Sequence, residues 1–180
     1  MRIEAIGLKE TIKHLEEYRN NLASKQHEII QKLAEMGIEV ARARFQDAQY
    51  AGENGRVTVG DVVWKSNNEA YFVASGEKVL FVEFGTGTYF EEHPDPKGYV
   101  RGAFGQGQGA NPPWEYAGEL GINPPPGTEY VTNKKGVQQY SKDGEPLVRT
   151  MGNPPARGMY DAERTIRDKI HEVAKEVFHD

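Results

Sequence analysis

A seven-residue repeat of apolar side chains near the N-terminus limits what this chain can fold into more than any other feature. Apolar residues recur at every seventh position and at interleaved positions: Leu8, Leu15, Leu22, Ile29 and Met36, with Ile12, Leu33 and Val40 between them. This spacing predicts a helix over residues 8–48 with a narrow apolar seam of the kind found in coiled coils, interrupted by Arg19 and Gln26. At 1.5 Å per residue the helix would be roughly 60 Å long, too long for a compact domain of this size to cover.

Two arrangements of this first helix, which we place within residues 1–50, are consistent with the pattern. In one, the helix bends near Asn20 and Asn21, or kinks at Gly37, and packs entirely on its own sheet. In the other, its first half projects and packs on a neighbouring subunit, because a seam without cover in its own chain needs a neighbour. The sequence leaves both arrangements open.

Residues 56–87 are expected to form the sheet core. Residues 56–65 and 70–74 are rich in β-branched and aromatic side chains and are bounded by turn signals, so we predict two strands. The apolar run 78–84 is either a third strand or one to two turns of buried helix, because periodicity does not separate these for a short run.

The middle of the chain, residues 88–154, is predicted to be a Gly- and Pro-rich excursion that leaves and rejoins the core. We expect a hairpin over residues 128–141 and a last short strand at residues 147–151. Residues 91–126 predict little regular structure. Two aromatic residues stand out as anchors in this polar loop: Trp114 and Tyr116.

A final amphipathic helix is predicted within residues 155–180, because apolar residues from Met159 to Val177 step by three and four. The 180 residues suit a single domain over residues 1–180. We therefore predict an α+β fold, in which a small, mostly antiparallel sheet is packed by a long N-terminal helix and a C-terminal helix, with a long Gly/Pro-rich insertion.

Composition narrows the classes of function. The net charge is −5, which is unlike the basic surface of most nucleic-acid binders. The chain has no cysteine, which excludes disulfides and thiolate metal sites. No window approaches the roughly 20 apolar residues of a membrane span. The first residues carry the acids Glu4 and Glu10 and do not resemble a signal peptide, so we expect a soluble protein made in the cytoplasm.

The best candidates for a metal or acid–base site lie in the loop after the apolar run: Glu91, Glu92, His93 and Asp95. Adjacent loop residues do not share a face as helical ligands at i and i+4 do, so we favour a solvated acidic turn over a small metal-dependent hydrolase. We predict no catalytic, cofactor-binding or metal-binding residue, and no enzyme activity.

Nucleic-acid binding has a little more support. Arg42, Arg44 and Arg56 cluster around the end of the long helix, and several aromatic residues are present for stacking. The acidic balance of the chain and the placement of the aromatics in strands and loops favour packing instead. We predict no sequence-specific contact with nucleic acid.

The apolar run ends in the motif Glu83-Phe84-Gly85-Thr86-Gly87. An acid among apolar residues needs partners, because an unpaired buried charge is expensive. We expect Phe84 in the core, the two glycines in a turn, and Glu83 holding that turn by accepting backbone hydrogen bonds. The alternative is that Glu83 lies on a subunit interface.

Three groups of residues then occur in a familiar order. They are the Glu83-Phe84-Gly85-Thr86-Gly87 motif, the aromatic pair Trp114 and Tyr116, and a late motif with Pro155, Ala156, Met159 and Tyr160 before the last helix. Over nearly the whole chain this order resembles the head–tail joining, or tail-completion, proteins of long-tailed bacteriophages and prophages. The chain departs from that pattern at Gly158, where family members often carry Phe or Pro.

The resemblance implies a structural virion protein of the phage neck that self-associates into a ring and docks portal or connector and tail terminator or tail-tube proteins. It implies a location in the virion, and in the host cytoplasm during assembly, with no cofactor and no membrane partner. DNA would pass through the ring, where an acidic lining would weaken phosphate contacts. The alternative is a non-catalytic prophage or host protein-binding module that uses residues 88–154.

Overall fold

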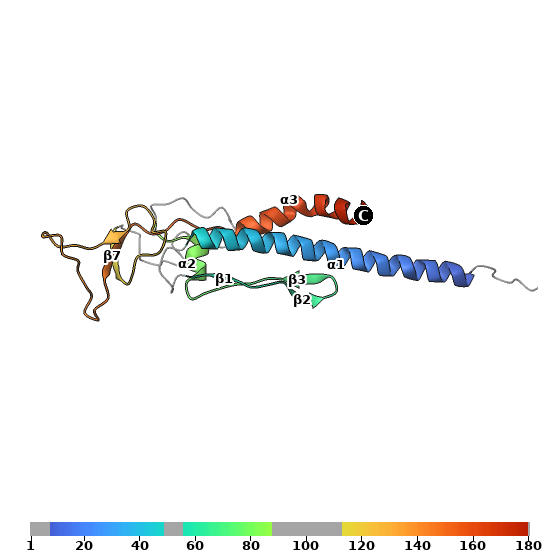
Figure 1. The fold of residues 1–180 in the computed structure, drawn as a ribbon, viewed down its shortest axis with the longest axis horizontal. Helices are drawn as coiled ribbons and strands as arrows, with labels where there is room; N and C mark the ends of the chain where they lie inside the picture. Colours follow the sequence, from blue (N-terminus) through green and yellow to red (C-terminus); the bar gives the residue numbers. More distant parts are fainter. Residues whose placement is uncertain (1–7, 49–55, 88–112, 180) are drawn as a thin grey trace, which may run out of the picture.

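The computed structural model describes residues 8–48, 56–87 and 113–179, and the fold is α+β (Figure 1). The helices are α1 (Leu8–Asp47), α2 (Val79–Phe84) and α3 (Gly158–His179). The strands are β1 (Thr58–Val59), β2 (Val63–Ser66), β3 (Glu69–Tyr71), β4 (Ala74–Ser75), β5 (Trp114–Ala117), β6 (Glu129–Tyr130) and β7 (Leu147–Thr150). Every pair of these strands is antiparallel, as the sequence predicted.

The first helix, α1, is one element of 40 residues. It continues without a break through Asn20, Asn21 and Gly37, so the predicted bend or kink at these residues is wrong (Figure 1). The glycine serves close packing instead. A Cβ atom at Gly37 would lie 2.7 Å from Cδ1 of Ile166 on α3, so any side chain there would require Ile166 to shift.

The last helix, α3, runs antiparallel to α1 and covers its C-terminal part (Figure 1). Val173 and Val177 of α3 pack on Leu33 in one buried cluster. In a second cluster, Ala162 of α3 packs with Ala41 and Phe45 of α1. This packing confirms the amphipathic helix predicted within residues 155–180, although the helix begins only at Gly158.

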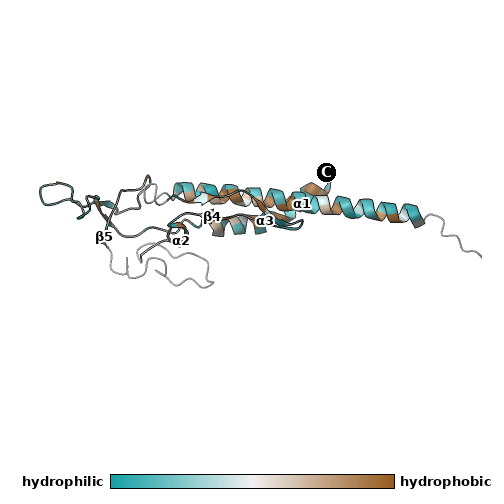
Figure 2. Ribbon diagram, turned by 90° about the horizontal axis from the view of Figure 1, so that it is seen from below, coloured by the Kyte–Doolittle hydropathy of each residue, from teal (hydrophilic) through white to brown (hydrophobic). Residues whose placement is uncertain are grey.

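The first half of α1 extends past the end of α3, and its apolar side chains are exposed (Figure 1). The structure therefore has the projecting helix of the second arrangement, and the packing of that half on a neighbouring subunit stays a prediction. Figure 2 shows why the projecting end remains compatible with water. The ribbon of this end is coloured mainly as hydrophilic residues, with fewer hydrophobic residues between them.

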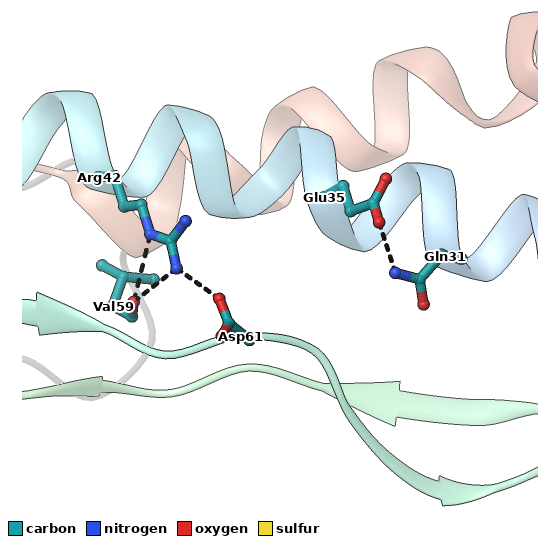
Figure 3. Close-up of polar contacts among 5 residues, drawn as sticks. All are labelled: Gln31, Glu35, Arg42, Val59 and Asp61. Carbon is teal, nitrogen blue, oxygen red and sulfur yellow. Dashed lines mark hydrogen bonds and ion pairs between the residues drawn. The ribbon is translucent and has the colours of Figure 1, made fainter.

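The two strands predicted at residues 56–65 and 70–74 are each split into two short strands. β1 pairs with β4, and β2 with β3, so together they form one irregular hairpin. Arg42 of α1 fastens this hairpin: its Nη2 lies 3.1 Å from the carbonyl oxygen of Val59 and 2.7 Å from Oδ1 of Asp61 (Figure 3). Gly37 of α1 faces both elements, since a Cβ atom there would lie 3.2 Å from Phe72 of the hairpin and 2.7 Å from Ile166 of α3, so the hairpin and α3 lie on adjacent sides of α1 (Figure 1).

The apolar run adopts the helical alternative and forms α2. A three-stranded sheet in the order β5-β7-β6 lies beyond it. The strand predicted at residues 147–151 is confirmed by β7, and the hairpin predicted over residues 128–141 is confirmed by β6 and by the bridge between Thr132 and Gln138.

Little regular structure was predicted over residues 91–126, and this prediction is wrong for residues 114–117, which form strand β5. Trp114 and Tyr116 do not anchor a loop, as expected, but alternate along this strand as its two half-buried residues. Their partners across the ladder, Thr150 and Val148, lie more than 30 residues away in sequence, so no local pattern indicates the pairing. The remainder of that expectation, residues 91–112, lies outside the described residues.

Candidate functional site: the junction of the two motifs

The centre of the candidate site is the carboxylate of Glu83, which lies at the N-terminus of α3. Its Oε2 accepts a hydrogen bond from the backbone N–H of Met159, and its Oε1 accepts one from the N–H of Tyr160, each at 3.1 Å. The first N–H groups of a helix have no partner within the helix, and a negative charge there is favoured by the helix dipole. Glu83 therefore caps α3 from another element, and it is only 5% exposed.

This arrangement agrees with the prediction that Glu83 accepts backbone hydrogen bonds, and it changes the identity of the donors. They belong to the helix that follows the late motif, and not to the turn after Glu83. Glu83 and the two residues whose N–H groups it binds are 76 and 77 positions apart, so the two motifs are one physical unit. A single charged side chain from the first sets where the second begins its helix.

Backbone pairing joins the same two segments. The N–H of Ala156 donates to the carbonyl oxygen of Val82 at 2.9 Å, and the N–H of Thr86 donates to that of Asn153 at 2.9 Å. Side chains strengthen the junction: the N–H of Asn153 donates to Oγ1 of Thr86 at 3.1 Å, and its Nδ2 donates to the carbonyl oxygen of Phe81 at 3.1 Å. Segments 81–87 and 152–160 therefore hold each other in place, and we call this pairing the motif junction.

Glycines make the motif junction possible. Gly85 has φ of 75°, and a Cβ atom there would lie 2.8 Å from the carbonyl oxygen of Asn153. Gly152 has φ of 102°, and its Cβ would lie 2.3 Å from the carbonyl oxygen of Thr86. Gly87, at φ of 79°, is the third glycine of the motif junction with a positive φ. The prediction that Gly85 and Gly87 are turn residues is confirmed, and backbone contact adds a second reason for them.

The other predicted residues lie around the motif junction at different depths. Ala156 is buried in the larger core cluster with Met159 packed against it, and Pro155 is half-buried. Phe84, predicted in the core, is only half-buried at the edge of a groove. At Gly158 a Cβ atom would lie 2.6 Å from the ring of Phe45, so the start of α3 packs closely on α1 there.

One hollow next to the motif junction is an apolar groove of about 420 Å³ between the hairpin, α2 and the start of α3. We call it the apolar groove. Its lining combines aromatic and aliphatic residues with two carboxylates: Phe72, Val73, Ala74, Val79, Leu80, Glu83, Phe84, Met159, Tyr160 and Glu163. Both charged side chains in this lining are acidic, and both have partners within the chain: Glu83 caps α3, and Oε1 of Glu163 lies 2.6 Å from Nη2 of Arg167.

A second hollow, of about 380 Å³, lies on the other side of the motif junction and is lined by Trp114 and Tyr116 together with Thr86 and Lys78. The Trp114 ring lies over Gly87, where a Cβ atom would be 3.3 Å from Cη2. Burial raises the pKa of the Tyr116 hydroxyl above its ordinary value, and neighbouring Tyr130 adds to the rise. The structure thus brings the aromatic pair to the motif junction, which their spacing in sequence does not indicate.

Other predicted residues stand apart from this site. Arg44 forms an ion pair with Asp161 at 2.8 Å, and Arg42 fastens the hairpin, so both have partners within the fold. His27 is exposed and stacks on Trp64, with ring centroids 3.7 Å apart. Glu91, Glu92, His93 and Asp95 lie outside the described residues.

Within the three described ranges, no group of three or more His, Cys, Asp or Glu side chains is arranged to hold a metal ion. In the same ranges, no helix has both the length and the apolar character needed to cross a bilayer. Comparison with known proteins finds no protein-family model, no curated protein and no solved structure that matches this chain.

Proposed function

We propose that this protein is a structural component of the neck of a long-tailed phage or prophage particle, where it forms a ring that joins head to tail. The observation that carries the proposal is the motif junction. The Glu83 motif and the late motif that begins α3, on which the resemblance stands, bind each other through the Glu83 cap. If the resemblance reflects a fold in common with the neck proteins, the residues that carry it should contact one another in space. Two motifs that matched by chance would have no reason to be in contact.

The distribution of apolar surface supports a role in assembly. The motif junction fixes α3 against the C-terminal part of α1, and the N-terminal part of α1 remains without cover among the described residues. Exposed apolar surface on a projecting element is typical of a protein that completes its burial against partners. In the proposed ring those partners are copies of this chain, together with portal or connector proteins on one side and tail terminator or tail-tube proteins on the other.

The net charge of −5 fits a channel through which DNA passes, because acidic groups weaken contact with phosphates. This part of the proposal concerns the lining of the assembled ring. A lumen lined mainly by Lys and Arg side chains in a reconstruction of the particle would contradict it.

The test of the proposed function is the composition of purified virions. Induction of the host strain should give particles that contain this protein in a ring-like copy number, detected by quantitative mass spectrometry. Deletion of the gene should give separate heads and tails that join when purified protein is added back. Intact, infective particles from the deletion strain would refute the proposal.

The second hollow favours one alternative, a non-catalytic prophage or host protein-binding module. Trp114 and Tyr116 present aromatic surface beside the charged Lys78, which suits the docking of a peptide. Affinity capture from host lysate and from phage-induced lysate separates the two functions. A host protein bound in both lysates, lost on Trp114→Ala, and no virion incorporation would favour the module.

A further inference from the structure

The uncovered part of α1 carries one continuous apolar stripe, which we call the tip stripe. It consists of Ile12, Leu15, Tyr18 and Leu22, which are 47%, 62%, 68% and 42% exposed. Steps of three and four residues place these side chains on one face of the helix. The stripe begins where α3 stops, since Nζ of Lys25 donates to the carbonyl oxygen of Val177 and lies 5.6 Å from the Phe178 ring.

The apolar groove lies near the other end of the same long helix. In Figure 1, α2, which lines the groove, is beside the C-terminal end of α1, whereas the tip stripe is at the far N-terminal end. Val73 and Leu80 on the groove's lining are themselves exposed apolar residues. One chain therefore carries a convex apolar element and a concave apolar element at opposite ends.

Charge favours pairing the stripe with the groove over pairing two stripes. Arg19 lies seven residues after Ile12, and therefore on the same face as the tip stripe. The charged residues that line the groove, Glu83 and Glu163, are both carboxylates. Two stripes packed in parallel would bring their Arg19 side chains together, whereas in the groove Arg19 would meet Glu163, whose Oε1 also pairs with Arg167 at 2.6 Å.

We propose that the tip stripe of one copy of this chain docks in the apolar groove of the next copy, with Arg19 beside Glu163. This is helix-in-groove recognition, in which residues on one helical face act as anchors. Because the two surfaces differ, each copy keeps one free stripe or one free groove after pairing, and the contact repeats until it closes as a ring. The inference rests on the proposed function and identifies the contact that would build its ring.

The absence of cysteine makes cross-linking a clean test. Leu15→Cys and Leu80→Cys variants are prepared separately, and both positions are exposed, so both variants should fold like the wild type by circular dichroism. Mixing them with a short bismaleimide at up to about 1 mM, where even weak pairs associate, should give the Leu15→Cys/Leu80→Cys heterodimer as the main product. Tyr140→Cys, also exposed but outside both surfaces, replaces Leu80→Cys in the matched control and should give little product.

A mixture dominated by Leu15→Cys homodimers would overturn the inference in favour of stripe–stripe pairing, and the absence of any 15–80 product would overturn it as well. The charge contact is tested by Arg19→Glu in the Leu15→Cys chain, which should slow heterodimer formation about fivefold. Glu163→Arg in the Leu80→Cys chain should restore the rate, and failure of this rescue would refute the Arg19–Glu163 contact.

The inference and the proposed function fail in different ways. Virions that contain the protein, combined with no 15–80 cross-link, would refute the groove contact alone. A 15–80 cross-link in a protein absent from virions would refute the neck function and leave the contact standing.

Discussion

Replacement of the buried Glu83 by leucine tests the motif junction most severely. The substitution removes both acceptors from the N-terminus of α3 and leaves the N–H groups of Met159 and Tyr160 without the carboxylate. Each net hydrogen bond to a charged group contributes about 1.5–3 kcal/mol. The leucine side chain recovers part of this loss through apolar burial of about 1.5–3 kcal/mol.

We therefore expect Glu83→Leu to lower the free energy of unfolding by about 1.5–3 kcal/mol, which is the loss of two such hydrogen bonds less the gain from apolar burial. Glu83→Gln keeps one acceptor oxygen but turns its NH₂ group towards an N–H donor, so we expect a loss of about 2 kcal/mol. For a chain of this length, a loss of 3 kcal/mol lowers Tm by roughly 6–12 °C.

Urea unfolding followed by circular dichroism measures these differences, with Glu77→Leu as the matched control. Glu77 is exposed just before α2, so its replacement should change the free energy of unfolding by less than about 0.5 kcal/mol. Equal effects of Glu83→Leu and Glu77→Leu would refute the cap. Mass photometry of Glu83→Leu separates this role from an interface role, since a folded variant with unchanged oligomer size argues against the interface.

Three further predictions follow from the geometry. Gly152→Ala should lower the free energy of unfolding by about 3 kcal/mol in a urea titration, because its Cβ would lie 2.3 Å from the carbonyl oxygen of Thr86. The control, Gly144→Ala, also has a positive φ, of 83°, but no atom within 4 Å of the added Cβ, so it should lose only about 1–2 kcal/mol. Equal losses in the two variants would contradict the clash with Thr86. The raised pKa of Tyr116 means that the folded state keeps this proton longer than the unfolded state, so stability should fall as pH rises above about 10, and Tyr116→Phe should flatten that fall in pH-dependent melting curves. Asp61→Asn should change Tm by no more than about 2 °C, because the ion pair of Asp61 with Arg42 is exposed. A larger drop in Tm would mean that this ion pair contributes much of the stability of the hairpin.

The helices could be predicted from the sequence because their signals are local. The seven-residue repeat of α1 and the three-and-four spacing of α3 each repeat over many turns, so single irregular residues such as Arg19 do not hide them. The pattern also indicated a seam too long for its own chain to cover, and the exposed tip stripe agrees. It did not indicate which part would be covered, because that depends on where α3 ends.

The strands and the motif junction depend on partners far along the chain. Strand β5 pairs with β7 more than 30 residues away, and its four residues, although Trp114 and Tyr116 favour strands, are too short a run to identify it among glycines and prolines. The sequence suggested that Glu83 accepts backbone hydrogen bonds, but not that the donors would be Met159 and Tyr160. A kink was predicted at Gly37, and its contact with Ile166 was not. That contact joins two helices that only tertiary packing brings together, so no local pattern indicates it.

The central claim is that this chain acts by contact within a phage particle, and a cryo-EM reconstruction of the neck of the induced virion tests it most directly. We predict a closed ring of this protein between portal and tail, with the tip stripe of each copy bound in the apolar groove of the next. Density for the neck that is fully accounted for by other proteins, with no copy of this chain, would contradict it.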